Sequence, residues 1–210
     1  MYRNLREFLA LLEEHGELDR IKLPVNPDEE IAEITDRIVK NGGKALLFEN
    51  TGTRFPVSIN MFGSDGRMAA ALGAGSLDEI PARIEQFAAK VLSPKSTVGD
   101  KAAVLPLLAK AAKWFPKKVS GRGRCQDIVL KGTDARLSLL PILKCWPHDG
   151  GRFVTLPLVH TVDPETGVPN VGMYRLQVFD AYTTGMHWHM HKTGAKHYAA
   201  YKRLGRRMPV

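Results

Sequence analysis

A basic, glycine-bearing segment at residues 116–124 separates two stretches of the chain whose sequence patterns favour different kinds of fold. Residues 1–115 alternate between helical and strand-like patterns, which is typical of a small α/β domain. Residues 125–191 contain β-branched and aromatic runs, frequent turn signals and no long helical pattern. We therefore predict an α+β protein, with an N-terminal α/β domain over residues 1–118 and a β-rich domain over residues 119–210.

The N-terminal stretch begins with a well-marked helix. Asn4 and Glu7 stand at the spacing of a capping box, and apolar residues then recur at helical intervals until Gly16. A strand is expected to follow over residues 18–25.

A second helix is expected directly after that strand. Asn26 would cap it, Pro27 would occupy its first turn, and Glu29 would be the reciprocal acceptor of the cap. Three isoleucines at helical spacing would then face the core. They are Ile31, Ile34 and Ile38.

The rest of the N-terminal stretch predicts two strands and then helices. Short apolar runs at residues 45–48 and 55–60 flank a turn-rich segment, which predicts paired strands. Two or three helices are expected over residues 65–115. In one of them four apolar residues share a face, and we predict that this face belongs to the core. They are Ile80, Ile84, Phe87 and Val91.

The β-rich stretch predicts a hairpin, a third strand and a final helix. The apolar segments 153–162 and 171–179 flank residues 163–167, whose Asp-Pro-Glu-Thr-Gly sequence is typical of a turn. A third strand is expected over residues 186–191. Residues 193–204 return to a helical pattern.

The formal net charge of +8 is concentrated in two basic islands. Residues 99–131 hold eight basic and two acidic side chains, and residues 192–210 hold six basic and no acidic ones. Such islands can attract nucleic acid, an anionic membrane surface or a phosphate-bearing cofactor. Charge alone favours the simpler interpretation of two solvated faces.

The composition argues against membrane and disulfide-rich classes. No apolar run approaches the roughly 18 to 20 residues that a membrane span needs, and the start of the sequence lacks the pattern of a secretory signal. Cys125 and Cys145 are too few for a disulfide framework and too far apart for a C-x-x-C motif. We expect a cytoplasmic protein with reduced thiols.

Three histidines at alternate positions form the most concentrated set of candidate metal ligands. In an extended strand the imidazoles of His187, His189 and His191 would share one face. With a further ligand from elsewhere they could hold zinc or iron. The alternative, which this short pattern favours when taken alone, is a row of imidazoles hydrogen-bonded on a half-exposed sheet.

Asn170 and Arg175 form a second candidate set on the preceding predicted strand. An asparagine carbonyl oxygen suits a hard cation, and arginine offers a planar donor fork for carboxylate or phosphate. Five residues apart, the two side chains face opposite sides of an ideal strand, although a bulge or Gly172 would change that geometry. The hairpin order places both near the histidines.

Beyond these patterns, the sequence resembles the UbiD family of decarboxylases along nearly its whole length. The matching segments are residues 4–9, 17–18, 43–50, 56–57, 60–63, 141–147, 170–175 and 187–191. The first five resemble the family's N-terminal domain, the sixth its entry into the flavin-binding β-domain, and the last two its cofactor site.

The resemblance implies both a fold and a reaction. The second domain would be the first part of a flavin-reductase-like split β-barrel. The reaction would be non-oxidative, reversible decarboxylation of an aromatic or α,β-unsaturated carboxylic acid, in ubiquinone biosynthesis or aromatic acid metabolism. It would use prenylated FMN and a divalent metal, foremost Mn²⁺, with K⁺ as a further candidate. The flavin would take up the electrons left by carbon dioxide, and a glutamic acid would protonate the product carbon.

The resemblance also assigns roles to residues. Asn170 and His191 would be the metal ligands, and the metal would bind the flavin phosphate as well. Arg175 would be the catalytic residue that grips the substrate carboxylate. Eight residues would line the flavin: Met173, Tyr174, Arg175, His187, Trp188, His189, Lys192 and Thr193.

Part of the family's site has no counterpart in this stretch. Asp180 is the only acidic residue after Arg175, so neither the family's metal-binding glutamate nor its two catalytic glutamates can come from there. We therefore expect the 210-residue chain alone to be inactive or nearly so. The alternatives are a non-catalytic flavin- or phosphate-binding fragment and, less favoured because the islands lack aromatic interleaving, a basic nucleic-acid-binding protein.

The resemblance implies partners as well. They are a small aromatic or conjugated acid as substrate, a flavin prenyltransferase as the supplier of the cofactor, and further copies of the chain in a homo-oligomer. Nucleic acid is not expected.

Overall fold

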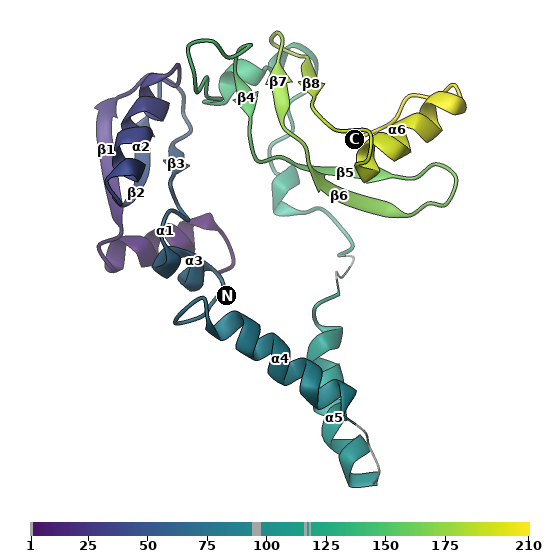
Figure 1. Cartoon of the computed structure of the whole chain (residues 1–210). Coiled ribbons are helices and arrows are strands. Elements are labelled where there is room, and N and C mark those ends of the chain that lie inside the picture. Colours follow the sequence, from purple (N-terminus) through teal and green to yellow (C-terminus); the bar gives the residue numbers. More distant parts are fainter. Residues whose placement is uncertain (1, 94–97, 116, 118) are drawn as a thin grey trace. The chain divides into compact units, whose positions relative to one another are not determined.

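The computed structural model describes residues 2–93, 98–115, 117 and 119–210, and it is a mixed α+β structure with several small sheets (Figure 1). Two compact units are present, and each combines two separate stretches of sequence. The first unit consists of Met1–Glu17 and Met61–Leu130, and the second of Leu18–Asn60 and Lys131–Val210. The domain division expected at residue 118 stays a prediction.

The first unit is helical. Its elements are α1 (Leu5–Glu14), α3 (Asp65–Ala71), α4 (Glu79–Leu92), α5 (Val98–Ala112) and the short 3₁₀ helix η1 (Arg124–Gln126). The cap predicted for α1 is confirmed, because the Asn4 side chain accepts a hydrogen bond of 3.1 Å from the Glu7 backbone N–H. Phe8 and Leu12 are buried on the inner face of α1, and the Phe8 ring stacks on Phe62.

The predicted core face of α4 is not buried. None of its residues is buried, and the Ile84 side chain is 62% exposed. Phe87 is half-buried, with its ring 5.1 Å from the ring of Trp114. The prediction was wrong because helical spacing establishes which face is apolar but does not supply a partner to cover it.

The second unit contains a small βαβ arrangement. Strands β1 (Leu18–Pro24) and β2 (Ala45–Asn50) are parallel and joined by α2 (Glu30–Lys40), while β3 (Val57–Ile59) pairs antiparallel with β2, which confirms the predicted strand pair. The buried core consists of Val25, Ile31, Leu46 and Phe48. Ile34, Ile38 and Leu143 pack against it, so the predicted inner face of α2 is confirmed.

The start of α2 differs from the prediction. The helix begins at Glu30, not after Asn26, and Asn26 instead accepts a hydrogen bond from the Asp28 N–H. The intervening residues include a parallel bridge from Asp28 to Lys144, and the Glu29 N–H donates to the Lys144 carbonyl at 2.8 Å. Because this pairing engages Asp28, and Glu29 has a φ of 66° outside the right-handed helical region, the helix begins only at Glu30.

The remainder of the second unit is built of short strands. Two 3₁₀ turns, η2 (Gly132–Asp134) and η3 (Leu137–Leu139), precede β4 (Phe153–Val154), β5 (Leu158–Val162), β6 (Pro169–Met173), β7 (Leu176–Val178) and β8 (Thr184–Met186). One sheet has the order β4-β7-β8, and β5 and β6 form the predicted hairpin. Each long predicted arm is thus divided into two strands. The split barrel stays a prediction.

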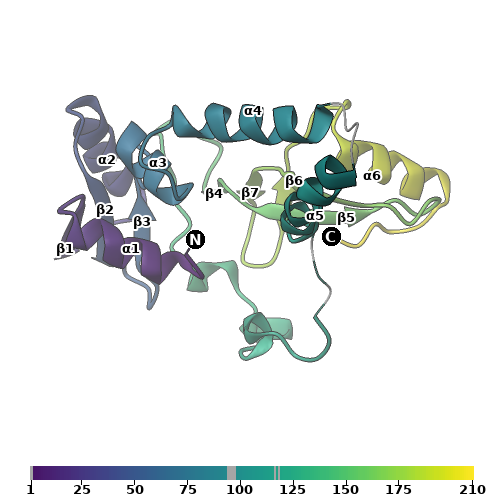
Figure 2. The same ribbon diagram turned by 90° about the horizontal axis from the view of Figure 1, so that it is seen from below.

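Helix α6 (Thr193–Arg203) lies beside the β5–β6 hairpin (Figures 1 and 2). Its predicted position is confirmed, and it buries Gly194, His197, Ala200 and Tyr201. In the described residues, no helix is long and apolar enough to cross a membrane. Cys125 and Cys145 are both free thiols.

Candidate functional site

A polar network connects the β5–β6 hairpin to α6. Thr161 on β5 and Asn170 on β6 are cross-strand partners, so their backbones fix them beside each other. The Asn170 amide nitrogen lies 3.4 Å from the Thr161 hydroxyl and 3.4 Å from the Tyr174 hydroxyl. The Thr161 hydroxyl lies 2.9 Å from Nδ1 of His197. Asn170 is therefore held by Thr161 on β5 and by Tyr174 just after β6, and α6 in turn contacts the Thr161 hydroxyl.

Tyr174 is the buried centre of this arrangement. Its side chain is 5% exposed, and its hydroxyl accepts a hydrogen bond of 3.0 Å from the Gly194 N–H in the first turn of α6. The ring occupies the space that a Cβ would need at two glycines: such an atom would lie 2.3 Å from the ring at Gly172 and 2.9 Å at Gly194. Glycine at these two positions therefore permits Tyr174 to join the hairpin to α6.

Trp188 extends this centre toward the surface. Its half-buried ring lies 5.7 Å from the ring of Tyr174, edge to face, and 5.7 Å from the ring of Tyr198 on α6. Such aromatic contacts restrict the orientation of the indole. An aromatic surface is thus held between the end of β6 and α6.

The three histidines do not lie on one strand, so that prediction was wrong. Strand β8 ends at Met186, and after the His187 N–H donates to the Arg175 carbonyl at 2.9 Å the chain turns toward α6. Nε2 of His187 lies 3.3 Å from the Gln177 side-chain oxygen. His187, Trp188 and His189 line an open depression of about 380 Å³ together with Met186.

Arg175 is not on the same strand as Asn170. Strand β6 ends at Met173, and Arg175 lies in the irregular step before β7. Its guanidinium carbon lies 4.0 Å from the centre of the Phe153 ring, a cation–π contact that restrains an otherwise exposed side chain. The opposite-face geometry of an ideal strand therefore does not apply to this pair.

His191, Lys192 and Thr193 form the entry to α6. All three side chains are exposed, and Lys192 is the N-cap residue, without a side-chain cap hydrogen bond. The first turn carries no acidic residue. A helix N-terminus flanked by basic side chains is suited to bind an anion such as phosphate.

The structure thus brings part of the predicted site together. Asn170, Tyr174 and the start of α6 are linked by hydrogen bonds, and Trp188 joins them through its ring contact with Tyr174. Met173 is 61% exposed at the end of β6. In the described part of the chain no group of three or more His, Cys, Asp or Glu residues is placed to hold a metal ion. That Asn170 and His191 share one ion stays a prediction.

Thr161 and His197 were not predicted from the sequence. Thr161 is 1% exposed and His197 is 5% exposed. A usable sequence signal was the position of Thr161 two residues after Val159, because alternate residues of a strand share a face and a hydroxyl on a buried face needs a partner. His197 was recognised only as part of a helical pattern.

Two family profiles match the chain. The 3-octaprenyl-4-hydroxybenzoate carboxy-lyase N-terminal domain matches residues 9–85, and the 3-octaprenyl-4-hydroxybenzoate carboxy-lyase Rift-related domain matches residues 117–210. The second match contains the hairpin, the depression and α6. Together the two matches leave out only the start of the chain and residues 86–116.

Curated relatives are similar over the whole chain. An uncharacterized protein of Aquifex aeolicus is 47% identical over 214 residues, covering 100% of this chain and 43% of the relative. One of Archaeoglobus fulgidus is 48% identical over 198 residues, covering 94% of this chain and 40% of the relative. The chain spans about two-fifths of the length of these proteins.

Solved structures show the same relationship. Vanillic acid decarboxylase of Sedimentibacter hydroxybenzoicus in its closed form superposes with a TM-score of 0.77 and 26% identity, covering 99% of this chain and 42% of that one. The UbiD-class enzyme HmfF of Pelotomaculum thermopropionicum in complex with FMN gives a TM-score of 0.74 and 26% identity, covering 97% of this chain and 40% of that one.

Proposed function

This chain belongs to the UbiD family of carboxy-lyases, and from that membership we propose that it supplies the flavin- and metal-binding part of a decarboxylase. The proposed reaction is non-oxidative, reversible removal of carboxylate from an aromatic or α,β-unsaturated acid. The proposed cofactors are prenylated FMN and a divalent cation, foremost Mn²⁺. HmfF binds FMN or prenylated FMN in its solved structures, which supports the choice of flavin.

The observation that carries the proposal is the orientation of Asn170. Its amide nitrogen has two acceptors, the hydroxyls of Thr161 and Tyr174. Within the described residues the amide oxygen has no hydrogen-bond donor, so it remains available to bind a metal ion. An amide oxygen held in one orientation is a suitable ligand for Mn²⁺ or Mg²⁺. His191 would be the second ligand.

The start of α6 supports binding of the flavin phosphate. His191, Lys192 and Thr193 lead directly into a helix N-terminus, and Lys196 adds a further exposed cation in the first turn. A phosphate there would interact with both the helix dipole and the lysine ammonium groups. A metal held by His191 would be adjacent in sequence to this phosphate site.

The ring of the flavin needs an apolar wall with polar groups at its edge. The depression lined by Met186, His187, Trp188 and His189 offers both, and Trp188 is restrained by Tyr174 and Tyr198. With Met173 and Thr193 these residues make up the proposed cofactor wall. When bound, the flavin would supply an acceptor for the electrons left by departing carbon dioxide.

Arg175 is proposed to bind the substrate carboxylate. Its planar guanidinium can donate two parallel hydrogen bonds to a carboxylate, and the Phe153 ring beneath it limits the positions that it can take. In this role Arg175 would hold the scissile carboxylate in place.

A second candidate is a flavin- and phosphate-binding module without catalysis. It is favoured by one observation, that Asp180 is the only acidic residue after Arg175 and its carboxylate already accepts hydrogen bonds from Tyr182 and Thr183. Release of carbon dioxide from supplied aromatic acids, with prenylated FMN and Mn²⁺ present, separates the two candidates. We expect this chain alone to bind the cofactors with little or no turnover.

The binding test uses FMN and Mn²⁺ with matched histidine variants. Asn170→Ala and His191→Ala are each expected to weaken Mn²⁺ and FMN binding together, because one ion joins the protein to the phosphate. His160→Ala is the control, since His160 is exposed on β5 beside the network but outside the proposed site. Losses of metal and flavin affinity that occur independently of each other would contradict a shared site.

A further inference from the structure

We propose that Thr161 and His197 are positioning residues that set the amide of Asn170 for metal binding. This inference rests on the proposed function, because it assigns a purpose to the groups behind the proposed ligand. Neither residue belongs to the cofactor wall. Both act on the other side of Asn170, inside the contact between β5 and α6.

Burial is the first argument. Thr161 is 1% exposed and His197 is 5% exposed, and their side chains meet at 2.9 Å across the hairpin–helix contact. Placing a hydroxyl and an imidazole in a core costs free energy unless both are hydrogen-bonded. Valine has nearly the same shape as threonine, so packing alone does not require this pair. The polar groups therefore need a different explanation.

The direction of the hydrogen bonds is the second argument. The Tyr174 hydroxyl accepts from the Gly194 N–H at 3.0 Å and is also 3.4 Å from the Asn170 amide nitrogen. The Thr161 hydroxyl accepts from the same amide and, when the imidazole of His197 carries its proton on Nε2, donates its own hydrogen to Nδ1. In this tautomer, donation runs from Asn170 through Thr161 to His197.

This direction has one consequence for Asn170. When Thr161 donates its only hydrogen to His197, its oxygen can only accept from Asn170, so half a turn of the amide would place the Asn170 oxygen against the Thr161 oxygen, acceptor against acceptor. The oxygen is therefore directed away from the β5–α6 contact. Groups that orient a metal ligand in this way commonly change metal affinity by about 10-fold to 100-fold when they are removed.

The test compares two substitutions at Thr161 with one at Asn170. Thr161→Val keeps the shape and removes the hydroxyl, and Thr161→Ser keeps the hydroxyl and removes a methyl group. Mn²⁺ affinity is measured by electron paramagnetic resonance with FMN present. We expect Thr161→Val to raise the Kd for Mn²⁺ about 10-fold, and Thr161→Ser to remain close to the unmodified chain.

The outcomes separate this inference from the proposed function. If Asn170→Ala loses Mn²⁺ while Thr161→Val binds like the unmodified chain, the positioning role is overturned and the metal site stands. If Asn170→Ala binds Mn²⁺ normally, both fail. An equal loss in Thr161→Ser and Thr161→Val also overturns the inference, because the hydroxyl would then not be the cause.

A measurement on the unmodified chain covers the case in which Thr161→Val does not fold. The side-chain NH₂ signals of Asn170 are followed by ¹⁵N NMR in the absence of metal. Two hydrogen-bonded amide protons are expected to exchange slowly with water. Exchange as fast as that of the exposed Asn50 side chain would overturn the inference.

Discussion

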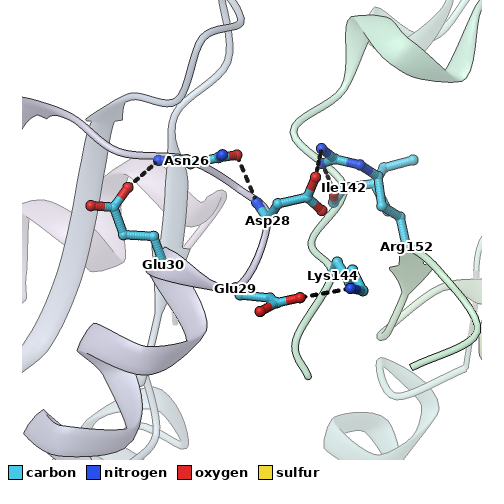
Figure 3. Close-up of polar contacts among 7 residues, drawn as sticks. All are labelled: Asn26, Asp28, Glu29, Glu30, Ile142, Lys144 and Arg152. Carbon is cyan, nitrogen blue, oxygen red and sulfur yellow. Dashed lines mark hydrogen bonds and ion pairs between the residues drawn. The ribbon is translucent and has the colours of Figure 1, made fainter. Parts of the chain in front are cut away.

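The ammonium group of Lys144 lies 2.6 Å from the carboxylate of Glu29, joining residues that are 115 positions apart in the sequence (Figure 3). Arg152 adds a second ion pair to Asp28 at 3.0 Å and donates to the Ile142 carbonyl at 2.6 Å. Backbone hydrogen bonds run in both directions between the same two segments. The βαβ part and the strand-rich part of the second unit are therefore joined by side chains and backbone together.

Removing the Glu29 charge is expected to loosen this junction. The hydrogen bond to Glu29 raises the pKa of Lys144, so the stabilising effect of the pair is present below the ordinary lysine pKa and is lost as the pH rises through the raised value. In Glu29→Gln the pKa of Lys144 should fall toward the ordinary lysine value. The backbone amide hydrogens at positions 29 and 144 should then exchange faster with water. Glu33→Gln, which affects an ion pair inside α2, is the control.

An added methyl group at Gly172 is expected to disrupt the candidate site. The new Cβ would lie 2.3 Å from the Tyr174 ring, so Gly172→Ala should destabilise the protein by about 1–3 kcal/mol. Flavin binding should weaken with it. Gly66→Ala is the matched control, because Gly66 lies in α3 with nothing within 4 Å of the added atom, and it should stabilise by about 0.5–1 kcal/mol. Urea unfolding measures both changes.

The β5–β6 loop is expected to depend on pH through Asp163. Hydrogen bonds from the backbone N–H groups of Glu165 and Thr166 hold the pKa of this carboxyl below its ordinary value. Its stabilising effect is therefore present above the ordinary pKa and is lost as the pH falls through the lowered one. Carboxyl ¹³C NMR should show this low pKa, and Asp163→Asn should remove the loop's response to acid. Titration at the ordinary value would contradict this explanation.

Truncation of two isoleucines should separate real core from apolar surface. Ile31 lies on the inner face of α2 and is fully buried, so Ile31→Ala is expected to cost about 2–5 kcal/mol. Ile84 on α4 is 62% exposed, and Ile84→Ala should change stability by less than about 0.5 kcal/mol. A large loss at Ile84 in denaturant unfolding would mean that its face is covered in solution.

The elements that depend on local signals were predicted well. The Asn4 cap, the isoleucine face of α2 and the turn after Asp163 each follow from residues within a few positions of one another. The delayed start of α2 could not be read in this way, because its cause is the pairing of Asp28 and Glu29 with Lys144 far along the chain.

The same limit applies to the candidate site. Family resemblance named Asn170 and Tyr174, but the pattern of alternate histidines wrongly extended β8 beyond Met186. Contacts made by Tyr174 with Gly172 and Gly194, and by Thr161 with His197, arise only when α6 packs on the hairpin. Tertiary packing, not local preference, decides these positions.

Paramagnetic NMR with Mn²⁺ tests the proposed site most directly. Mn²⁺ is titrated with FMN into the ¹⁵N-labelled chain, and the amide signals that broaden first mark the residues nearest the ion. Early broadening is expected at Asn170, Tyr174 and His191. Broadening that begins instead at acidic positions such as Asp163 and Glu165, with Asn170 and His191 unaffected, would contradict the metal-tethered flavin site.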